Sequence, residues 1–252
     1  MNTTNDVNPT LSLLTAHRSI RAFPPDPIPD EHIAAAVRAG QAASTSSAVQ
    51  AYCIIRITDA DARSEIAALA GNQPYIQSAP AFFIICADSR RHRLTGEARA
   101  MPYDTRLEAF LVATIDASLF AQNLATAFES LGYGVCYIGG IRSDLPRLDA
   151  LLQLPEGVYP LFGLCVGTPA QDPSPRPRLP LDAVLMQDRY DDDAVRRAVG
   201  EYDRTYRTYL QDRGAPQAQI DQAWAARMAE YHSAPRRPGL AAYYASKGAR
   251  LD

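Results

Sequence analysis

Residues 104–140 read DTRLEAFLVATIDASLFAQNLATAFESLGYGVCYIGG, and this stretch decides the fold class. Apolar and small residues recur in it at three- and four-residue spacing, which predicts one long helix over about 104–131 that ends at Gly132. The strand predicted next, at 133–140, ends in two glycines. A helix roughly 40 Å long with such a continuous apolar face is typical of a core helix or of a subunit interface.

The flanking sequence adds short strands separated by helices. Further strands are predicted at 52–58, 81–87 and 159–167, and helices at about 9–16, at 31–43 with Asp30 as N-cap, between Asp59 and Gly71, and after a Ser143 cap. Residues 88–103 are charged and poorly patterned, 168–180 are proline-rich and extended, and two or three helices are expected after residue 190. This order favours an α+β layer fold over a doubly wound sheet.

Composition and charge exclude several classes of protein. The 252 residues are 47% hydrophobic and 21% charged, which is ordinary globular usage, and the formal charge of −3 argues against a dedicated nucleic-acid binder. Lys247 is the only lysine among the 25 basic residues. Schiff-base catalysis, which needs a lysine amine, is therefore disfavoured.

The cysteines and the N-terminus indicate a cytoplasmic protein. Each cysteine lies in an apolar run and none forms a CxxC pair, which predicts buried, reduced thiols at Cys53, Cys86, Cys136 and Cys165. Residues 1–9 are polar, and the LSLL that follows is too short for a signal sequence. No uninterrupted apolar run approaches the ~18 residues of a membrane span, so no membrane partner is expected.

Several common catalytic motifs are missing. The chain has no GxSxG, GxxxxGK[ST] or HExxH motif, and its four histidines lack the spacing of metal ligands, so no metal site is expected. The GYGVCY at 132–137 begins like a dinucleotide fingerprint, but Tyr137 stands where the last glycine belongs. It also leads from a helix into a strand, which is the wrong order for that motif.

Three short segments are candidates for binding an anion or a ligand. HRSIR at 17–21 offers two guanidinium groups and a hydroxyl to a phosphate, or is a solvated charge cluster. RPR at 176–178 holds two arginines at a set separation, which suits an anion as well as surface ion pairs. YIGG at 137–140 leaves room for a ligand close to backbone N–H groups, or is only a turn.

Taken in order, these segments resemble the nitroreductase family. The resemblance is carried by HRSIRAF at 17–23, a serine-rich loop before YCIIRITD, then GNQ, YIGGIR, PLFGLCVG and PRLP, and it extends over about residues 10–215. It points to the branch of the oxygen-insensitive NADPH nitroreductases and the flavin reductases of luminous bacteria. It implies a mostly antiparallel sheet flanked by helices, in an interlocked homodimer with two FMN sites. It also implies an FMN-binding core at 10–190 and a helical excursion at 191–252 that covers the active site.

The resemblance also implies which residues hold FMN. By position they are His17, Arg18, Ser19, Arg21, Thr45, Ser46, Ser47, Gln50, Gln73, Tyr137, Ile138, Gly139, Gly140, Arg176 and Arg178. Those at 17–19, with Arg176 and Arg178, hold the phosphate, and those at 45–50 come from the partner subunit. Arg21 lies near N1 and the C2 carbonyl of the flavin ring, and Gln73 bonds its pyrimidine edge.

NADPH recognition is implied for the C-terminal third. The family carries its key arginine in a YLxxRG-like stretch, which matches YLQDRG at 209–214 and singles out Arg213. The alternative is a cation at a helix C-terminus with Gly214 as the cap. Residues 215–219 lack the further arginines of the family, and Arg236 and Arg237 are expected to compensate.

The implied activity is a two-electron, ping-pong reduction. A hydride passes from NADPH to nitroaromatics, quinones or related acceptors through FMN, which performs the chemistry, so no acid–base residue is needed. The alternatives are a flavin reductase that supplies free reduced FMN to a partner, a flavin-binding protein without turnover, and a purely structural dimer.

Overall fold

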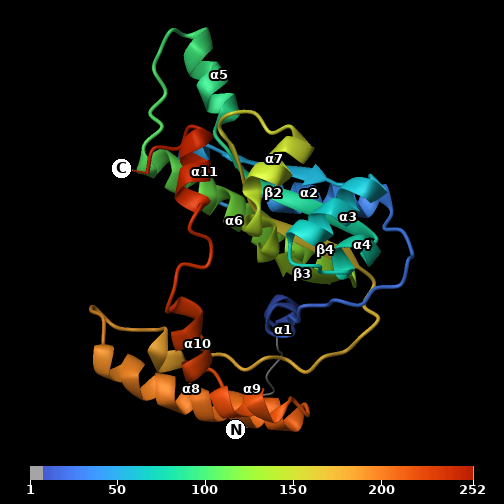
Figure 1. Ribbon diagram of the computed structural model, residues 1–252, viewed down its shortest axis with the longest axis vertical. Coiled ribbons are helices and arrows are strands. Elements are labelled where there is room, and N and C mark those ends of the chain that lie inside the picture. Colours follow the sequence, from blue (N-terminus) through green and yellow to red (C-terminus); the bar gives the residue numbers. More distant parts are fainter. Residues whose placement is uncertain (1–7, 252) are drawn as a thin grey trace. The chain divides into compact units, whose positions relative to one another are not determined.

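The computed structural model describes residues 8–251, and a four-stranded antiparallel sheet forms its centre (Figure 1). The strands are β1 (Tyr52–Arg56), β2 (Ala81–Asp88), β3 (Gly134–Ile138) and β4 (Val158–Gly167), in the order β1-β2-β4-β3. Every neighbouring pair runs antiparallel, with one β-bulge between β2 and β4. The predicted α+β class and the mostly antiparallel sheet are therefore confirmed.

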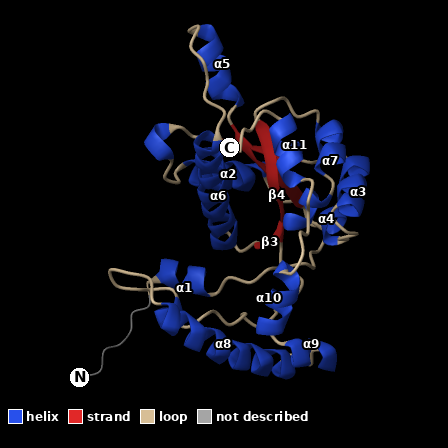
Figure 2. Ribbon diagram, turned by 60° about the vertical axis from the view of Figure 1, so that its left-hand side comes forward, coloured by secondary structure: helices blue, strands red, loops and turns tan. Residues whose placement is uncertain are grey.

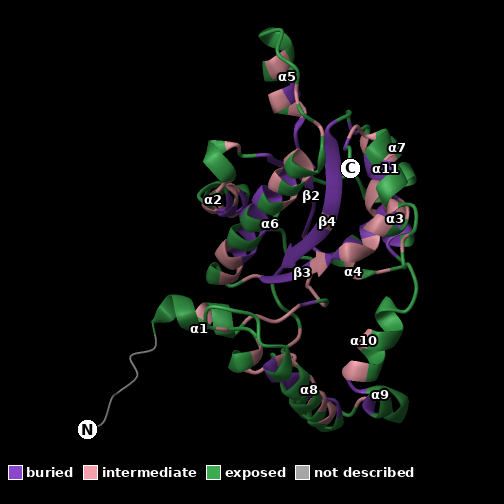
Figure 3. Ribbon diagram, turned by 90° about the vertical axis from the view of Figure 1, so that its left-hand side faces the viewer, coloured by how far each residue is buried: buried purple, intermediate pink, exposed green. Residues whose placement is uncertain are grey.

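Helices cover both faces of this sheet (Figure 2). The helix α6 (Leu107–Ser130) lies along one face with α2 (Asp30–Gln41) packed beside it. On the other face lie α3 (Ala60–Leu69), α4 (Tyr75–Ser78), α7 (Leu145–Leu152) and α11 (Leu240–Ser246). Because both faces are covered, all eight residues of β2 are buried (Figure 3).

The long predicted helix is present as α6. Its buried residues recur at helical spacing toward the sheet and include Ala113, Ala117, Phe120, Leu124 and Phe128. The helix ends where expected, because Gly132 has a φ of 87°, a conformation that glycine adopts without steric cost. By length and composition this helix could also cross a membrane, but its packing against the sheet and α2 accounts for its apolar character.

The charged stretch at 88–103 contains a helix that the sequence analysis did not predict. This helix, α5 (Arg90–Ala98), buries Arg93 alone, so it shows no apolar periodicity. The Arg93 guanidinium donates to the carbonyl of Gly248 at 2.7 Å and pairs with the Glu156 carboxylate at 2.5 Å. A buried cation thus takes the place of the apolar residue that usually anchors a helix.

Two predicted helix caps are wrong by one residue. Pro29 rather than Asp30 precedes α2, and Asp30 lies in its first turn, where it pairs with Arg56. Asp144 rather than Ser143 caps α7, since its carboxylate accepts from the backbone N–H of Arg147 at 3.2 Å. Both carboxylates remain at a helix N-terminus, where negative charge is favourable.

The chain divides into two compact units: one contains residues up to 173 and from 239 onward, and the other contains residues 174–238. The last residues of the chain thus return to the first unit. The N-terminal residues 1–7, within the stretch expected to be polar, lie outside the described part.

The C-terminal segment is firmly attached to the first unit. The hydroxyl of Tyr244, on α11, donates to the carbonyl of Pro160 at 3.0 Å. The Lys247 ammonium pairs with Asp149 at 3.0 Å and donates to the carbonyl of Leu154 at 2.6 Å. The single lysine is therefore a structural anchor.

The second unit consists of helices and loops. It contains a 3-10 turn (Leu181–Ala183), α8 (Asp192–Asp212), α9 (Gln217–Gln222) and α10 (Ala225–His232). Its own small core joins Tyr202, Tyr206 and Leu210 of α8 to Ile220 of α9. With α11, four helices follow residue 190 within the described part of the chain, which is more than the two or three expected.

All four cysteines are free thiols, as predicted. Cys86, Cys136 and Cys165 are buried, whereas Cys53 on the edge strand β1 is only half-buried. Burial raises the pKa of the Cys136 and Cys165 thiols above their ordinary value, so these groups stay protonated and unreactive at neutral pH.

Candidate functional site

The segment at 17–21 lies along the outer edge of β3. After α1 (Pro9–Thr15) the chain becomes extended, and Ser19 forms an isolated parallel bridge with Val135. The backbone N–H of Ile20 donates to the carbonyl of Val135 at 2.9 Å, and Ile20 itself is buried. The sheet edge therefore fixes the backbone on which His17 and Arg18 stand.

A hollow of about 640 Å³ opens beside this segment. It lies entirely within the first unit and is lined by Leu13, Ala16, His17, Arg18, Ile20, Glu129, Gly132, Tyr133, Gly134, Pro169, Gln171 and Asp172. Two cationic or potentially cationic side chains thus face a space of the size of a small-molecule site.

Each of these two side chains is paired with a carboxylate. Nδ1 of His17 lies 2.6 Å from Oε1 of Glu129, and Nη1 of Arg18 lies 2.7 Å from Oδ1 of Asp172. The Glu129 side chain is 12% exposed, whereas that of Asp172 is 81% exposed. The sequence analysis predicted neither Glu129 nor Asp172. Each pairs with a residue far away in the chain, so no local motif marks it.

Arg21 is exposed on the same segment, and its guanidinium lies beside Tyr75 and Cys136. Burial raises the pKa of the Tyr75 phenol, and the hydrogen bond and positive charge of Arg21 act in the opposite direction. The Tyr75 hydroxyl also donates to Oε1 of Gln73. Arg21 and Gln73 therefore share one neighbour, which brings two predicted site residues together.

Gln73 is joined in turn to the glycine pair after β3. Its Nε2 donates to the carbonyl of Ala70 at 2.6 Å. A Cβ on Gly140 would come within 2.4 Å of that carbonyl oxygen and of Nε2 of Gln73. Gly140 is thus required by close packing within the protein, and Gly139 begins the 3-10 turn (Gly139–Ser143).

The side chain of Tyr137 points toward α6. Its hydroxyl donates to the carbonyl of Ala121 at 2.8 Å, and its ring packs edge-on against Phe162. Burial, with a contribution from the Glu129 carboxylate, raises the pKa of this phenol far above its ordinary value. Ile138 is also buried. At this strand end, therefore, the backbone is available to a ligand and the side chains of Tyr137 and Ile138 are not.

The loop that contains Thr45, Ser46, Ser47 and Gln50 is backed by a buried carboxylate. Asp116 of α6 is fully buried and accepts from the backbone N–H groups of Ser46 and Ala51, each at 3.1 Å. Between these two bonds the backbone has positive φ at Ser47 (46°), Ala48 (58°) and Gln50 (53°). Such conformations cost energy for non-glycine residues, and the surrounding contacts hold them in place.

Arg176 and Arg178 belong to the second unit. The carbonyl of Pro177, between them, accepts from the hydroxyl of Tyr202 at 2.8 Å, which attaches this segment to α8. Nη1 of Arg178 donates to the carbonyl of Arg176 at 3.2 Å.

The arginines predicted to bind NADPH also lie in the second unit. Arg213 is the C-cap residue of α8 and donates to the hydroxyl of Tyr209 at 3.3 Å. The guanidinium of Arg236 lies over the ring of Tyr231, 3.8 Å from its centroid. Arg237, its neighbour, is half-buried. Arg213 thus has the helix-end position that the sequence allowed, next to Gly214 with a φ of 66°.

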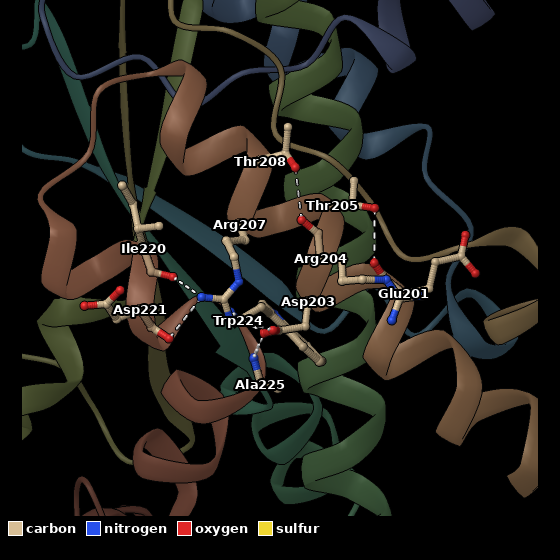
Figure 4. Close-up of polar contacts among 10 residues, drawn as sticks. All are labelled: Glu201, Asp203, Arg204, Thr205, Arg207, Thr208, Ile220, Asp221, Trp224 and Ala225. Carbon is tan, nitrogen blue, oxygen red and sulfur yellow. Dashed lines mark hydrogen bonds and ion pairs between the residues drawn. The ribbon is translucent and has the colours of Figure 1, made fainter.

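A polar network not predicted from the sequence stabilises this unit (Figure 4). Oδ1 of Asp203 accepts from the backbone N–H groups of Trp224 and Ala225 at 2.9 and 2.7 Å, at the start of α10. Arg207 pairs with Oδ2 of Asp203 and donates to the carbonyl of Ile220 at 2.8 Å, near the end of α9. One ion pair on α8 therefore caps both of the short helices.

The donors of the hollow fit a phosphate group. A guanidinium presents paired N–H donors that match phosphate geometry, and an imidazolium adds a further charged donor. Arg18 is already paired with a carboxylate, which shows that an anion is accommodated at this position. The residues present therefore fit the phosphate end of FMN.

Comparison with known proteins identifies the family of the chain. The Nitroreductase family model matches residues 14–168, and the model of the Nitroreductase family C-terminal domain matches residues 176–252. The chain belongs to the nitroreductase family.

Individual relatives cover nearly the whole chain. It is 40% identical over 247 residues to an FMN reductase (NADPH) of Bacillus subtilis, an alignment that covers 96% of this chain and 98% of the relative. It is 39% identical over 212 residues to an oxygen-insensitive NADPH nitroreductase of Salmonella typhimurium, covering 83% and 85%. A solved nitroreductase structure from B. subtilis superposes with a TM-score of 0.90 at 39% identity, covering 95% of this chain and 98% of that one.

Proposed function

We propose that this protein is an FMN-dependent oxidoreductase that takes a hydride from NADPH and reduces nitroaromatics, quinones or related small acceptors. The observation that carries the proposal is the hollow with His17 and Arg18 at the edge of β3, in a chain 40% identical to an FMN reductase (NADPH). When bound, FMN supplies the hydride chemistry, and the protein supplies binding, orientation and electrostatics.

The residues divide into those that bind the phosphate and those that orient the ring. His17, Arg18 and Ser19 are the proposed phosphate ligands at the edge of β3, and Arg176 and Arg178 are proposed as further phosphate ligands. Their charges offset that of the phosphate, and bidentate guanidinium contacts fix its orientation.

The ring is held by the group around Arg21 and Gln73. Arg21 places a fixed positive charge beside the N1 and C2-carbonyl edge, where such a charge stabilises developing negative charge. Gln73 bonds the pyrimidine edge, and the backbone N–H groups of Gly139 and Gly140 face N5. The contacts of Gln73 with Tyr75 and with Gly140 support the proposal that these residues act together.

A homodimer completes each site in this proposal. Leu107, Leu111, Ile115 and Leu119 form an apolar stripe along α6, at a spacing of four residues, and each is at least 41% exposed. We assign this stripe to contact with a second copy of the chain, because apolar rows of this kind are typical of interfaces. The loop at 45–50 then reaches the FMN of the partner subunit.

NADPH is the proposed hydride donor. Arg213, with Arg236 and Arg237, is proposed to bind the 2′-phosphate, a group that NADH lacks. The small hydrophobic acceptor then replaces the oxidised nucleotide at the same face of the flavin. No nucleic acid or membrane takes part, and the cytoplasm is the proposed compartment.

An absorbance spectrum tests the proposal most directly. Purified protein is expected to be yellow, to release FMN on denaturation, and to lose its visible absorbance when NADPH is added without oxygen. NADPH consumption with menadione or nitrofurazone then separates an enzyme from a flavin-binding protein without turnover. Colourless protein that does not bind added FMN would overturn the proposal.

A second candidate function is favoured by the similarity to the FMN reductase (NADPH) of Bacillus subtilis. In that case the acceptor is free FMN, which leaves reduced for a partner enzyme. Steady-state NADPH oxidation as a function of added FMN, compared with nitrofurazone, distinguishes the two. A higher kcat/KM for free FMN would support the flavin reductase.

A further inference from the structure

A carboxylate on the long helix lies against one of the proposed phosphate ligands. Glu129 is in the last turn of α6, and its Oε1 is 2.6 Å from Nδ1 of His17, which is 112 residues away in the chain. Both side chains line the hollow, and the Glu129 side chain is only 12% exposed against 30% for His17. The pair is thus built into the wall of the hollow.

The position of this contact on the imidazole ring determines what His17 can offer. Since Nδ1 donates to Glu129, Nε2 remains for a ligand. A neutral imidazole with its proton on Nδ1 has a lone pair at Nε2, which repels a phosphate oxygen, whereas the imidazolium presents an N–H there. A carboxylate at Nδ1 fixes the orientation of the ring and lies where it can compensate the charge of an imidazolium that binds an anion.

The second carboxylate of the hollow lacks these properties. Asp172 pairs with Arg18, but its side chain is 81% exposed and stands on the proline-rich segment without regular structure. It can turn into solvent when an anion arrives. Glu129 is held by a helix and is mostly covered, so it remains beside His17 whether or not a ligand is present.

We propose that Glu129 is a positioning residue for the phosphate of the bound flavin. Through Nδ1 it holds the His17 ring in one orientation, so that Nε2 is directed at a phosphate oxygen. Glu129 itself does not touch the ligand. The proposal rests on the proposed function, because it presupposes that FMN binds here.

Comparison of FMN with riboflavin isolates this effect, because riboflavin has the same ring and no phosphate. The full-length protein, freed of flavin, is titrated with each compound, and flavin fluorescence gives the dissociation constants. Glu129→Gln keeps an acceptor for Nδ1–H and removes the charge. We expect it to weaken FMN binding about tenfold, or about 1.4 kcal/mol, and to leave riboflavin binding within twofold of wild type.

Glu65→Gln is the matched control. Oε1 of Glu65 pairs with Arg147 at 2.7 Å, between α3 and α7, so this variant also removes one charge from an ion pair of the first unit. It is expected to change neither dissociation constant. A loss of FMN binding in this variant as large as that in Glu129→Gln would overturn the proposal.

A double-mutant cycle with His17→Asn shows whether Glu129 acts through His17. In the His17→Asn background, Glu129→Gln is expected to have less than a twofold effect on FMN binding. Three results would each overturn the proposal: an unchanged FMN affinity in Glu129→Gln, a parallel loss of FMN and riboflavin, or an undiminished loss in the His17→Asn background.

Circular dichroism and thermal unfolding verify that each variant is folded. If Glu129→Gln does not fold, Glu129→Asp replaces it, because it keeps the charge and withdraws it from Nδ1 by one methylene. It is expected to lose FMN affinity selectively but by less than tenfold. A wild-type protein that binds no FMN would contradict the proposed function, whereas wild-type binding with an unchanged variant would contradict this inference alone.

Discussion

At the residue scale, the hollow beside β3 contains two acid–base pairs with opposite consequences for an incoming anion. The carboxylate of Glu129 holds the ring of His17 through Nδ1, whereas that of Asp172 occupies the guanidinium of Arg18. A phosphate that binds here must therefore displace Asp172 from Arg18, whereas Glu129 can stay beside His17. This difference leads to distinct expectations for variants at the two pairs.

Arg18→Ala is expected to weaken FMN retention about 10- to 150-fold. Loss of one charge-assisted phosphate contact costs roughly 1.5–3 kcal/mol, and Arg178→Ala is expected to show a loss in the same range. Flavin fluorescence titration provides the measurement. Arg56→Ala is the control, because Arg56 forms an ion pair with Asp30 of the same 2.7 Å length and similar exposure. FMN bound as tightly by both variants as by wild type would contradict the phosphate assignment.

Asp172→Asn is expected to tighten FMN binding by about two- to fivefold. The variant removes the carboxylate that competes for Arg18, and an exposed ion pair contributes up to about 1 kcal/mol. The gain should shrink at high ionic strength, because salt screens the competing pair in the wild type. Titrations at low and high salt measure both effects. A weaker affinity for FMN in this variant would mean that Asp172 assists binding.

Arg213→Ala is expected to raise the KM for NADPH about tenfold, or about 1.4 kcal/mol, with NADH kinetics and FMN content nearly unchanged. A contact made equally in ground and transition states affects KM much more than kcat. Arg196→Ala, another exposed arginine of α8, is the control. If the ratio of kcat/KM for NADPH and NADH stays the same, Arg213 is only a helix-end cation, and Arg236 and Arg237 are the next candidates.

At the scale of elements, Asp203 determines how α9 and α10 attach to α8. Its carboxylate accepts two backbone N–H bonds and pairs with Arg207, and these contacts hold its pKa below the ordinary 3.8 despite partial burial. A depressed pKa means that the contribution to stability is present above about pH 4. It is lost as the pH falls through the folded-state pKa.

Asp203→Asn is therefore expected to destabilise the second unit at pH 7 by about 1–2 kcal/mol, since its charge-assisted bonds become neutral ones. The difference from wild type should close as the pH falls through the depressed pKa of Asp203. Urea unfolding followed by the fluorescence of Trp224, the only tryptophan, reports on this unit. Asp192→Asn, which removes an exposed carboxylate of the same helix, is the control. An equal loss of stability at both pH values would contradict the assignment.

Elements with strong local signals could be predicted from the sequence. The apolar spacing of α6 and the Asp59 cap of α3 depend on residues within a few positions of each other, and both are present. The helix α5 was missed because a buried arginine, Arg93, replaces its apolar anchor. Asp30 is a favourable cap by residue type, but Pro29 supplies the extended conformation that a cap needs, so the helix begins at Asp30 itself.

The site was predictable only in part, for a similar reason. Motifs at 17–21 and 137–140 stand out because their residues are adjacent in sequence. Glu129 and Asp116 contact residues more than 60 positions away, so only the folded chain reveals them. The packing of Gly140 against Gln73 is likewise visible only in the folded chain. The sequence alone indicates no more than a turn at the two glycines.

At the scale of the whole molecule, the stripe on α6 leads to an expectation about assembly. Ile115 is 54% exposed in its middle. Ile115→Glu is expected to give a monomer in size-exclusion chromatography with light scattering, because a buried, unpaired carboxylate opposes association. FMN should be lost as well, since the partner's loop is then absent. Glu108→Gln, in the first turn of α6, is the control and should remain dimeric. Thr114→Glu would not serve as a control, because the Thr114 hydroxyl is buried. A dimeric Ile115→Glu variant would exclude this stripe as the interface.

The return of the chain from the second unit to the first has a consequence for cleaved forms of the protein. The first part of the second unit exposes Leu181, Val184 and Leu185, and a protease that cuts there would divide the polypeptide in two. The downstream piece would still carry α11, whose Tyr244 and Lys247 are bonded within the first unit. Such a nicked molecule would migrate as two bands in denaturing gels and as one species in solution, and only a second cut near residue 239 would release the helices between.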